Sequence, residues 1–518
     1  MELRHLRTVR VIVSLAFFLL AAFMFIDLSG LLPPEVVATV SALQFGPALV
    51  RLFSGLTLSV CALAGVILLT VTFGRVYCST ICPLGTLQDL FSRLNRKRNS
   101  RRRFLYRRQN YLLHYGVLGL AAALACGGSM LLLNLLEPFS NFGRASVFFL
   151  RPLVVAINNL LAGALDLLHV YMLYPVPLRT PAPASYLVPI AFILTVFVLS
   201  YRGGRLFCNL LCPAGALLGI LSRIALFRIV IDKPACKDCG LCEKVCKAGC
   251  IDSVRMHVDF SACVSCFNCL HACPTTGLIY RGRRGDYPQQ QVLRSRRRRK
   301  VLRDGISAAA ALLVLPKDSL KTLLPAPTGK SRSTLPVTPP GSVGIAHFTS
   351  RCTACHLCVS TCPTQVLSPS FLEFGVDGIF QPRMDYSTGT CTYDCVKCGS
   401  VCPSGAILPL AQDEKKLVQI GKAKFVKEDC IVVTKKTECG ACSEHCPTKA
   451  VNMVKTDGLF LPVLNEELCI GCGSCEHPCP STPNKAIYVE ANPIHGRAKK
   501  PEPKKAVPQI KSDADFPF

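Results

Sequence analysis

The sequence predicts a multi-domain membrane protein in which a four-span α-helical bundle is followed by two small cysteine-rich α+β domains. Three observations lead to this fold class. Four long runs before residue 202 carry no charged residue, 24 of the 31 cysteines fall into six regularly spaced quartets, and a Pro/Ser/Thr/Gly-rich segment separates the last four quartets from the first two. Hydrophobic residues make up 50% of the 518-residue chain and its mean hydropathy is +0.37, which is high for a soluble protein.

The four charge-free runs are the predicted membrane spans. Each is long enough to cross a hydrocarbon core of ~30 Å, although the first needs help from the flanking residues Leu28–Leu32. The helical part of the last run is expected to begin near Ser185, after its prolines. The spans are Val11–Ile26, Leu52–Phe73, Gln109–Leu136 and Thr180–Tyr201.

A fifth apolar stretch, Ser146–Leu173, differs from the spans because it contains arginine, proline, asparagine, aspartate and histidine. A fifth span would also place the two basic segments of the chain on opposite sides of the membrane. We therefore predict that this stretch is an interfacial helix or a partial insertion on the outer face.

The net charge of +27 is concentrated where it would orient a membrane protein. Nine basic residues lie between Arg93 and Arg108, and ten lie between Arg281 and Arg303. Each block adjoins an apolar run or a cysteine quartet, so both are expected on the cytoplasmic side of the membrane. No nucleic-acid partner is predicted from this placement.

The chain divides into five predicted parts. The linker after the basic segment cannot build a core, and the last residues are rich in Lys and Pro and are expected to be disordered. The parts are the bundle (1–225), a cytoplasmic two-quartet domain (226–290), a basic and Pro-rich linking segment (291–344), a four-quartet domain (345–490) and a tail (491–518).

The six cysteine quartets indicate [4Fe–4S] clusters. Four follow the pattern C-x2-C-x2-C-x3-C, in which three thiolates on one tight loop bind three irons of a cubane and the fourth cysteine typically ligates the partner cluster. Structural zinc sites use two separated CxxC pairs, and disulfide scaffolds lack this strict local spacing. The regular quartets are Cys236, Cys239, Cys242 and Cys246; Cys263, Cys266, Cys269 and Cys273; Cys352, Cys355, Cys358 and Cys362; and Cys469, Cys472, Cys475 and Cys479.

Two further quartets are variants of this pattern. One has an extra residue in its first gap and the other has a first gap of eight residues, so Cys430 could instead be a buried free thiol. They consist of Cys391, Cys395, Cys398 and Cys402, and of Cys430, Cys439, Cys442 and Cys446.

The quartets of the second domain form an internal repeat, since they begin 39 residues apart. Each unit is too small to bury a core alone, so neighbouring units are expected to fold together. Sequential pairing and a nested pairing both fit this repeat. In the first domain Lys247 replaces the usual proline after Cys246, and the nearby Cys250 is predicted to be a buried thiol rather than a ligand.

Two CxxxCP motifs lie where a predicted span meets the cytoplasmic face. Each follows a Gly-Arg pair, and an i, i+4 spacing places both thiols of a motif on one helix face. These thiols are candidates for binding a metal such as copper, for a disulfide or for a redox contact. Cys61 and Cys126 are single cysteines inside spans and are predicted to be inert. The four motif cysteines are Cys78, Cys82, Cys208 and Cys212.

Residues 1–280 resemble the NapH-type membrane ferredoxins of periplasmic nitrate reductase systems, through the four spans, the two CxxxCP motifs and the two quartets that follow. From about residue 295 to 490 the chain is similar to NapG-type four-cluster ferredoxins. Ser295–Arg303 followed by the apolar Gly305–Pro316 resembles a twin-arginine export signal, although it is internal and lacks the usual aromatic residue. The resemblance implies a fusion of two subunits with two ferredoxin-like domains, the second of them periplasmic.

The resemblance also implies a quinol dehydrogenase in the bacterial cytoplasmic membrane. Such a protein would take electrons from the quinone pool, pass them through six [4Fe–4S] clusters and deliver them to a periplasmic or membrane redox partner. His114, Glu137 and His169 are weak candidates for a quinone site. The alternatives are a copper-handling or electron-donating factor for metalloenzyme maturation, since related membrane ferredoxins of that kind share the CxxxCP motifs, and a wholly cytoplasmic polyferredoxin.

Overall fold

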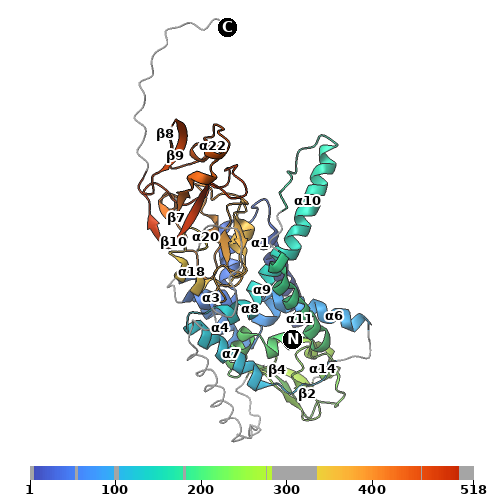
Figure 1. Ribbon diagram of the computed structural model, residues 1–518. Helices are drawn as coiled ribbons and strands as arrows, with labels where there is room; N and C mark the ends of the chain where they lie inside the picture. Colours follow the sequence, from blue (N-terminus) through green and yellow to red (C-terminus); the bar gives the residue numbers. More distant parts are fainter. Residues whose placement is uncertain are drawn as a thin grey trace.

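The computed structural model describes residues 5–52, 57–98, 104–178, 183–275, 277–282, 335–456 and 458–500. A helical bundle lies between two small cysteine-rich domains, which are far apart in the sequence and sit at opposite ends of the molecule (Figure 1). We call residues 226–282 the first cysteine-rich domain and residues 335–500 the second. The predicted twin-arginine-like segment and the tail beyond residue 500 lie outside the described residues.

The bundle is built from two halves that repeat the same order of elements. A long helix comes first, a second apolar helix leads to the Gly-Arg pair and the CxxxC turn, and a proline then starts a new helix. Proline suits the first position of a helix because its missing N–H would be unpaired there in any case. The first half comprises α1 (His5–Ile26), α2 (Pro34–Ala42), α3 (Phe45–Arg51), α4 (Thr57–Phe73), α5 (Tyr77–Thr80) and α6 (Pro83–Arg98).

The second half comprises α7 (Tyr111–Cys126), α8 (Leu131–Leu136), α9 (Pro138–Ala145), η2 (Ser146–Leu150), α10 (Arg151–Asp166), η3 (Pro183–Tyr186), α11 (Leu187–Gly203), α12 (Leu206–Leu210) and α13 (Pro213–Ser222). The last helix of each half packs against the long apolar helix of the other half. Helix α6 of the first half packs on α11 of the second, and α13 of the second half packs on α4 of the first.

Among the described residues, two helices are long and apolar enough to cross a membrane. They are His5–Ile26, which is the first predicted span, and the continuous helix Pro138–Asp166. The helices in the other three predicted spans have 17, 16 and 17 residues. In the third, the predicted run is interrupted after Cys126 by two glycines, and the chain turns there before α8 begins. Among the described residues, only the first predicted span is matched over its full length by one helix, and residues 53–56 of the second and 180–182 of the fourth lie outside the described residues.

Most of the stretch Ser146–Leu173 belongs to the 29-residue helix Pro138–Asp166, so the predicted helix is present, and its placement at the interface of the membrane stays a prediction. Its polar residues are satisfied by neighbours. Arg151 donates to the carbonyl of Ser360 in the second cysteine-rich domain. Asn159 exchanges two hydrogen bonds of 2.8 Å with the backbone of Val176, where the chain folds back along the helix. Arg151 and Asn159, which set this stretch apart from the predicted spans, thus have partners supplied by the tertiary structure.

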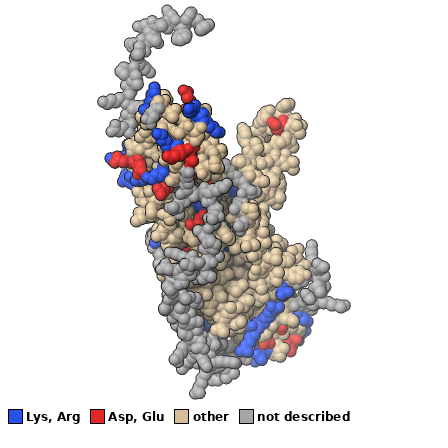
Figure 2. All heavy atoms as spheres, viewed as in Figure 1, with Lys and Arg blue, Asp and Glu red and all other residues tan. Residues whose placement is uncertain are grey.

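Large apolar side chains remain exposed on several bundle helices, which is unusual for a surface facing water. On this side of the molecule the surface between the two cysteine-rich domains has few charges, whereas charged residues gather on the domains themselves (Figure 2). Exposed residues of α1, α4, α10 and α11 include Ile12, Leu15, Leu19, Ile67, Leu68, Leu153, Ile157, Leu160, Leu187, Ile190 and Leu194.

The first cysteine-rich domain is a small α+β unit closed by its two ends. Strand β1 (Phe227–Ile231) pairs antiparallel with β4 (Leu278–Gly282), so the entry and exit strands lie side by side. Between them lie α14 (Leu241–Lys244), the two-residue strands β2 (Ile251–Asp252) and β3 (His257–Val258), and α15 (Asn268–Ala272).

The second cysteine-rich domain repeats this plan with short helices and two-stranded sheets. Its longest pairing joins β7 (Val418–Phe425) to β10 (Ile487–Arg497), so ordered structure continues past the predicted boundary at residue 490. Val337 and Thr338, predicted to lie in the linker, are buried in this domain. Its other elements are α18 (Ile345–Arg351), α19 (Leu357–Thr361), β5 (Leu367–Pro369), β6 (Pro382–Met384), α20 (Lys397–Ser400), α21 (Gln412–Lys415), η4 (Lys427–Asp429), α22 (Ile431–Thr434), α23 (Ala441–Glu444), β8 (Val451–Thr456) and β9 (Leu459–Leu464).

Helix α1 connects the two domains. Near its start, Arg7 lies 3.1 Å from the ring of His271 in the first cysteine-rich domain. Near its end, α1 forms a buried apolar cluster with α2, α9 and the second cysteine-rich domain. A 22-residue helix is ~33 Å long, about the thickness of a membrane core. The buried residues of that cluster are Ala21, Met24, Phe25, Val37, Val40, Phe139, Phe142, Val147, Cys355, Leu357 and Val401.

Candidate functional site: cysteine sites along the molecule

The six cysteine quartets of the sequence are regrouped in space. In each group three cysteines come from one quartet and the fourth comes from the neighbouring quartet. The same exchange occurs in both domains, so the second domain pairs its quartets sequentially and not in the nested arrangement. Sites B, D, E and F are each seen as one hollow lined by four such cysteines.

We name the groups by letters. In the first domain, site A comprises Cys236, Cys239 and Cys242. We assign Cys273 to it because Thr275, whose hydroxyl lies 3.7 Å from the sulfur of Cys273, donates to the carbonyl of Ala235 next to Cys236. Site B comprises Cys246, Cys263, Cys266 and Cys269. In the second domain, site C comprises Cys352, Cys355, Cys358 and Cys402; site D Cys362, Cys391, Cys395 and Cys398; site E Cys430, Cys439, Cys442 and Cys479; and site F Cys446, Cys469, Cys472 and Cys475.

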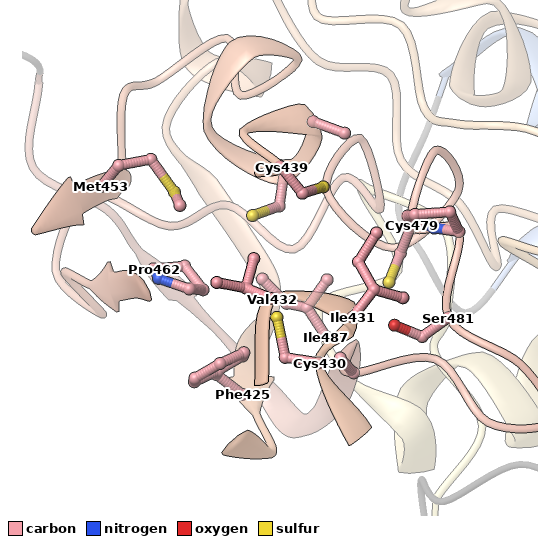
Figure 3. Close-up of a pocket in the computed structure, with 14 residues that line it drawn as sticks. Phe425, Cys430, Ile431, Val432, Cys439, Met453, Pro462, Cys479, Ser481 and Ile487 are labelled. Atoms are coloured by element: carbon pink, nitrogen blue, oxygen red, sulfur yellow. The ribbon is translucent and has the colours of Figure 1, made fainter. Parts of the chain in front are cut away.

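Site E tests the most irregular quartet. Cys430, separated from Cys439 by eight residues, lies next to the short helix α22. The labelled sulfurs of Cys430, Cys439 and Cys479 come from three separate segments and face one hollow among apolar side chains (Figure 3). Helix α22 fills the long gap, so an insertion between the first two cysteines does not remove Cys430 from the site.

Site B contains a fifth thiol. Cys250 lines the same hollow, and its sulfur lies 3.4 Å from that of Cys246.

The contacts of Lys247 explain why lysine replaces proline after Cys246. Lys247 Nζ lies 3.3 Å from a carboxylate oxygen of Asp89 in α6, and its carbonyl accepts a hydrogen bond from the backbone N–H of Arg205.

The sites have the chemistry that a cubane requires. Each offers four thiols, which are the usual ligands of [4Fe–4S] clusters. Backbone N–H groups also donate to cysteine sulfurs, as from Ala354 to Cys352 at 3.4 Å and from Ala450 to Cys446 at 3.3 Å. Such donors stabilise the negative charge of iron-bound thiolates. Among the described residues, no group of three or more His, Cys, Asp or Glu side chains is arranged to hold a single metal ion.

Contacts between the sites define an order within the second domain. Cys358 of site C interacts electrostatically with Cys398 of site D. The backbone N–H of Cys391 in site D donates to the carbonyl of Cys472 in site F at 3.0 Å. Sites F and E are joined by their exchanged cysteines. The spatial order is therefore C, D, F, E, which differs from the order in the sequence.

The two CxxxCP motifs come together in the bundle, although they are 130 residues apart. All four thiols are buried, and each of the six possible pairs among them interacts electrostatically. We call Cys78, Cys82, Cys208 and Cys212 the bundle thiols. Single cysteines of the spans behave differently, because Cys61 and Cys126 are exposed on the bundle surface.

A buried charge network lies between the bundle thiols and site B. The carboxylate of Asp89 lies 2.5 Å from Arg10, 2.8 Å from Arg205 and 3.3 Å from Lys247. Burial alone would raise the pKa of Asp89, but the attraction of these cations outweighs it and lowers that pKa. Cys266 of site B interacts electrostatically with Arg10 and Lys247.

The three quinone candidates have unequal surroundings. Glu137 caps the start of α9 by accepting hydrogen bonds from the backbone N–H groups of Phe139 and Ser140, which is a structural role. His114 is buried, and its ring stacks on Tyr115 at 5.6 Å. His169 lies exposed in the turn after α10. None of them lines the hollows of sites B, D, E and F.

Several functional residues were missed by the sequence reasoning. Arg75 and Arg205 were seen only as parts of Gly-Arg pairs, yet both are fully buried beside the bundle thiols. Asp89 gave one signal, since it is the single acidic residue between Val76 and Arg108. Tyr77 is buried between Cys82 and Glu137 and interacts electrostatically with both.

Comparisons with known proteins agree with an iron–sulfur protein. A model described as a 4Fe-4S binding domain matches residues 54–101 and 185–234, so each half of the bundle contains one match and one CxxxCP motif. Two models described as 4Fe-4S dicluster domains match residues 351–406 with 435–482, and residues 259–366. No solved structure matches the chain.

Among curated relatives, the chain is 30% identical over 191 residues to the methylamine utilization ferredoxin-type protein MauM of Methylophilus methylotrophus, covering 35% of this chain and 81% of the relative. It is 27% identical over 157 residues to the ferredoxin-type protein NapF of Escherichia coli (strain K12), covering 30% and 87%. It is 28% identical over 194 residues to the ferredoxin-type protein NapG of the same strain, covering 35% and 80%.

Proposed function

The chain belongs to the family of ferredoxin-type proteins that includes MauM, and on that premise we propose that it conducts electrons between the two faces of a membrane. Sites A to F would each hold one [4Fe–4S] cluster, six in all. When bound, such a cluster accepts and releases a single electron. The protein's own contribution is to hold the sites in order, to bury them and to fix the two domains at opposite ends of the bundle.

The observation that carries this proposal is the docking of the two domains on opposite ends of α1. The first domain contacts the start of the helix and the second contacts its last turns. Helix α1 is one of two helices in the described part of the chain that are long and apolar enough to span a membrane. If it does so, sites A and B lie at one face and sites C to F at the other.

The charge of the chain suggests which face is which. The described end of the basic segment, residues 104–108, lies against the first domain, where the backbone N–H of Arg107 donates to the carbonyl of Gly249 at 3.1 Å. Basic segments stay in the cytoplasm. We therefore assign the first domain to the cytoplasmic side and the second to the periplasm.

We propose quinol as the electron source and a periplasmic redox protein as the acceptor, which makes the chain a component of a quinol dehydrogenase. Support for the source comes from the resemblance to NapH-type membrane ferredoxins. Support for the acceptor comes from site E, the last site in the spatial order and the one farthest along the chain of sites from the bundle.

The first test is the position of the C-terminus. A C-terminal tag on the full chain is exposed to protease in intact spheroplasts and in lysed cells. Cleavage in intact spheroplasts is the expected result. Protection until lysis would overturn the assignment of the second domain to the periplasm and would favour a wholly cytoplasmic polyferredoxin.

The electron source needs a separate test. Purified, cluster-loaded protein in detergent is mixed anaerobically with a reduced quinone analogue while the visible absorbance of the clusters is followed. Bleaching without any other protein is expected. Reduction that requires an added soluble protein donor would contradict quinol as the direct source.

A further inference from the structure

We propose that Cys78, Cys82, Cys208 and Cys212 together ligate one additional [4Fe–4S] cluster, which relays electrons between site B and site C. The proposed site takes two thiols from each half of the bundle and lies at the centre of the repeat. Its role as a relay rests on the proposed function, whereas its existence as an iron–sulfur site does not.

The first argument is the symmetry of the surroundings. Arg75 of the first half donates to the carbonyl of Cys208 in the second half at 3.2 Å. Arg205 of the second half donates to the carbonyl of Cys78 in the first. The arginine of each half thus binds the cysteine turn of the other half, and the two motifs position each other. The two halves build one common site and not two separate ones.

The glycine after each motif supports this arrangement. A Cβ atom on Gly85 would lie 2.2 Å from the carbonyl oxygen of Cys78 and 2.5 Å from Arg205, and one on Gly215 would lie 2.3 Å from the carbonyl oxygen of Cys208 and 2.9 Å from Arg75. A side chain at either position would collide first with the backbone of the cysteine turn and then with the guanidinium of the other half. The glycine, the carbonyl and the arginine therefore pack in the same way in both halves.

The second argument is positive charge that lacks a counterion. Arg75 and Arg205 are both fully buried, and each interacts electrostatically with bundle thiols from both halves. Arg75 Nε and Arg205 Nη2 are buried donors with no hydrogen-bond partner among the described residues. Asp89 is the carboxylate of this network and is shared by three cations. Buried charges are normally paired, so the site calls for an anionic group.

A cubane with four thiolates provides that group, because it carries two or three negative charges depending on its redox state. Neutral thiols would leave Asp89 as the counterion of three cations, with the charge of Arg75 still to be balanced. Donors to the sulfurs are also in place, since Gln88 Nε2 donates to the sulfur of Cys208 at 3.2 Å and the backbone N–H of Gly215 donates to the sulfur of Cys212 at 3.3 Å. Hydrogen bonds of this kind tune iron–sulfur potentials.

The third argument is position. On one side Asn209, which follows Cys208, donates to the carbonyls of Ala248 and Ala262 in the loops that carry site B, both at 3.2 Å. On the other side Tyr77, which precedes Cys78, interacts electrostatically with Glu137. Glu137 in turn interacts with Cys355 of site C. The bundle thiols therefore lie between the two domains.

The electron balance of a relay is simple. One electron enters from site B and one leaves toward site C, so the [4Fe–4S]²⁺ core is reduced to [4Fe–4S]⁺ and oxidised again. No bond forms or breaks in this step, and no proton is transferred. Arg75 and Arg205 offset the extra negative charge of the reduced core.

The test compares two double variants of the full chain, produced anaerobically with ⁵⁷Fe. Cys78→Ser/Cys208→Ser removes one ligand from each half. Cys61→Ser/Cys126→Ser is the matched control, because it also replaces one cysteine in each half but at exposed positions. Iron and acid-labile sulfide are counted per chain, and Mössbauer spectra report the cluster type. Retained signals from sites A to F show that the variants fold.

The expected result is a loss of about four iron and about four sulfide ions per chain in the first variant and no loss in the control. Transfer from site B to site C, followed by rapid mixing, is expected to slow at least about 10-fold. Unchanged iron and sulfide, or a loss of copper instead of iron, would overturn the proposed site. Lost iron with an unchanged transfer rate would overturn its role as a relay.

The iron count does not depend on which side of the membrane each domain occupies. The proposed function can fail in the tag experiment while the iron count still decides the bundle site. Conversely, an unchanged iron count would remove the additional cluster and leave the position of the second domain untouched.

Discussion

The two cysteine-rich domains dock on the same bundle in different ways. The first shares a large buried apolar cluster with the bundle and adds a buried charge network, in which Asp89 of α6 binds Lys247 of the domain together with Arg10 and Arg205 of the bundle. The second is held by an apolar cluster in which aromatic side chains of α1 and α9 pack around its first cysteine loop. Around this cluster Arg151 and Arg51 donate to the carbonyls of Ser360 and Cys402, and Arg144 lies 5.4 Å from the ring centre of Phe380.

The difference indicates what each contact can do. A charge network places cations beside clusters and can therefore adjust their potentials. An apolar contact fixes position and excludes water but adds little charge. We expect the first domain to be sensitive to the loss of a charge and the second to be sensitive to the shape of the interface.

Removing the shared carboxylate of Asp89 should produce the largest difference in stability between the two docking interfaces. In Asp89→Asn, three cations lose their counterion in a buried site, which is expected to cost about 3–5 kcal/mol. The melting temperature of the purified chain should fall, and iron should be lost from sites A and B before sites C to F. Thermal unfolding with iron analysis measures both.

The control for that change is Glu373→Gln, which removes a more exposed ion pair to Arg383 in the second domain. Exposed pairs contribute at most about 1 kcal/mol, so its effect should be small. Equal destabilisation by the two variants would show that the Asp89 network does not anchor the first domain.

Changing the shape of the second interface comes next. A Cβ atom on Gly143 would lie 2.4 Å from the carbonyl oxygen of Cys355 and 2.6 Å from the ring of Phe25. Gly143→Val should therefore push the second domain from the bundle, at a cost of about 1–3 kcal/mol. Slower reduction of sites C to F, measured by rapid mixing, is the expected outcome.

The matched control is Gly163→Val in α10, where a Cβ atom meets nothing within 4 Å. It makes the same substitution in a helix without touching the second domain. If both variants slow the reduction equally, helix propensity and not docking explains the effect.

A finer difference concerns the fifth thiol of site B. Cys250 lies 3.4 Å from Cys246, and sites C to F are formed by four cysteines each. We expect Cys250→Ala to keep the cluster but to lower its reduction potential by an amount on the order of tens of millivolts, because a donor to an iron-bound sulfur is lost.

A redox titration followed by EPR measures this shift, with Cys250→Ser as the control that keeps a donor. Loss of the site B cluster in either variant would identify Cys250 as a ligand and contradict its assignment as a buried thiol.

The smallest expected effect is a difference between the two domains in how much stability each loses at acidic pH. Burial, with a further contribution from His347, lowers the pKa of His495 in the second domain to about 4. Because the folded-state pKa lies below the unfolded value of about 6.5, this histidine favours folding above pH ~6.5 and loses that contribution as the pH falls toward ~4. Asp89 has a lowered pKa, so its contribution persists through the same window.

His495→Gln should therefore flatten the loss of stability of the second domain between pH ~6.5 and ~4, measured by thermal unfolding at several pH values. His445→Gln changes an exposed histidine of the same domain and serves as the control. An identical pH profile in His495→Gln and the wild type would contradict the expected role of this buried side chain.

Much of this architecture could be predicted from local sequence and some of it could not. Cysteine spacing is a property of a short loop, so the quartets were recognisable, and the exchange of the fourth cysteine follows from the geometry of a paired unit. The order C, D, F, E depends on contacts such as that between Cys391 and Cys472, which no spacing records.

The same limit applies to the membrane helices. Arg151, Asn158 and Asn159 set the stretch after residue 146 apart from the predicted spans, because isolated polar groups are costly in an apolar environment. Their partners come from a distant loop and from a returning segment of chain, which only the tertiary structure reveals.

The central claim is best tested by electron transfer across a sealed membrane. Inside-out vesicles that contain the full chain and trapped ferricyanide receive dithionite on the outside, where the first domain is expected. The account predicts that the trapped ferricyanide is reduced, and that Cys352→Ser, which removes a thiol of site C, abolishes this reduction. Ferricyanide that stays oxidised until detergent opens the vesicles would contradict electron conduction between the two faces.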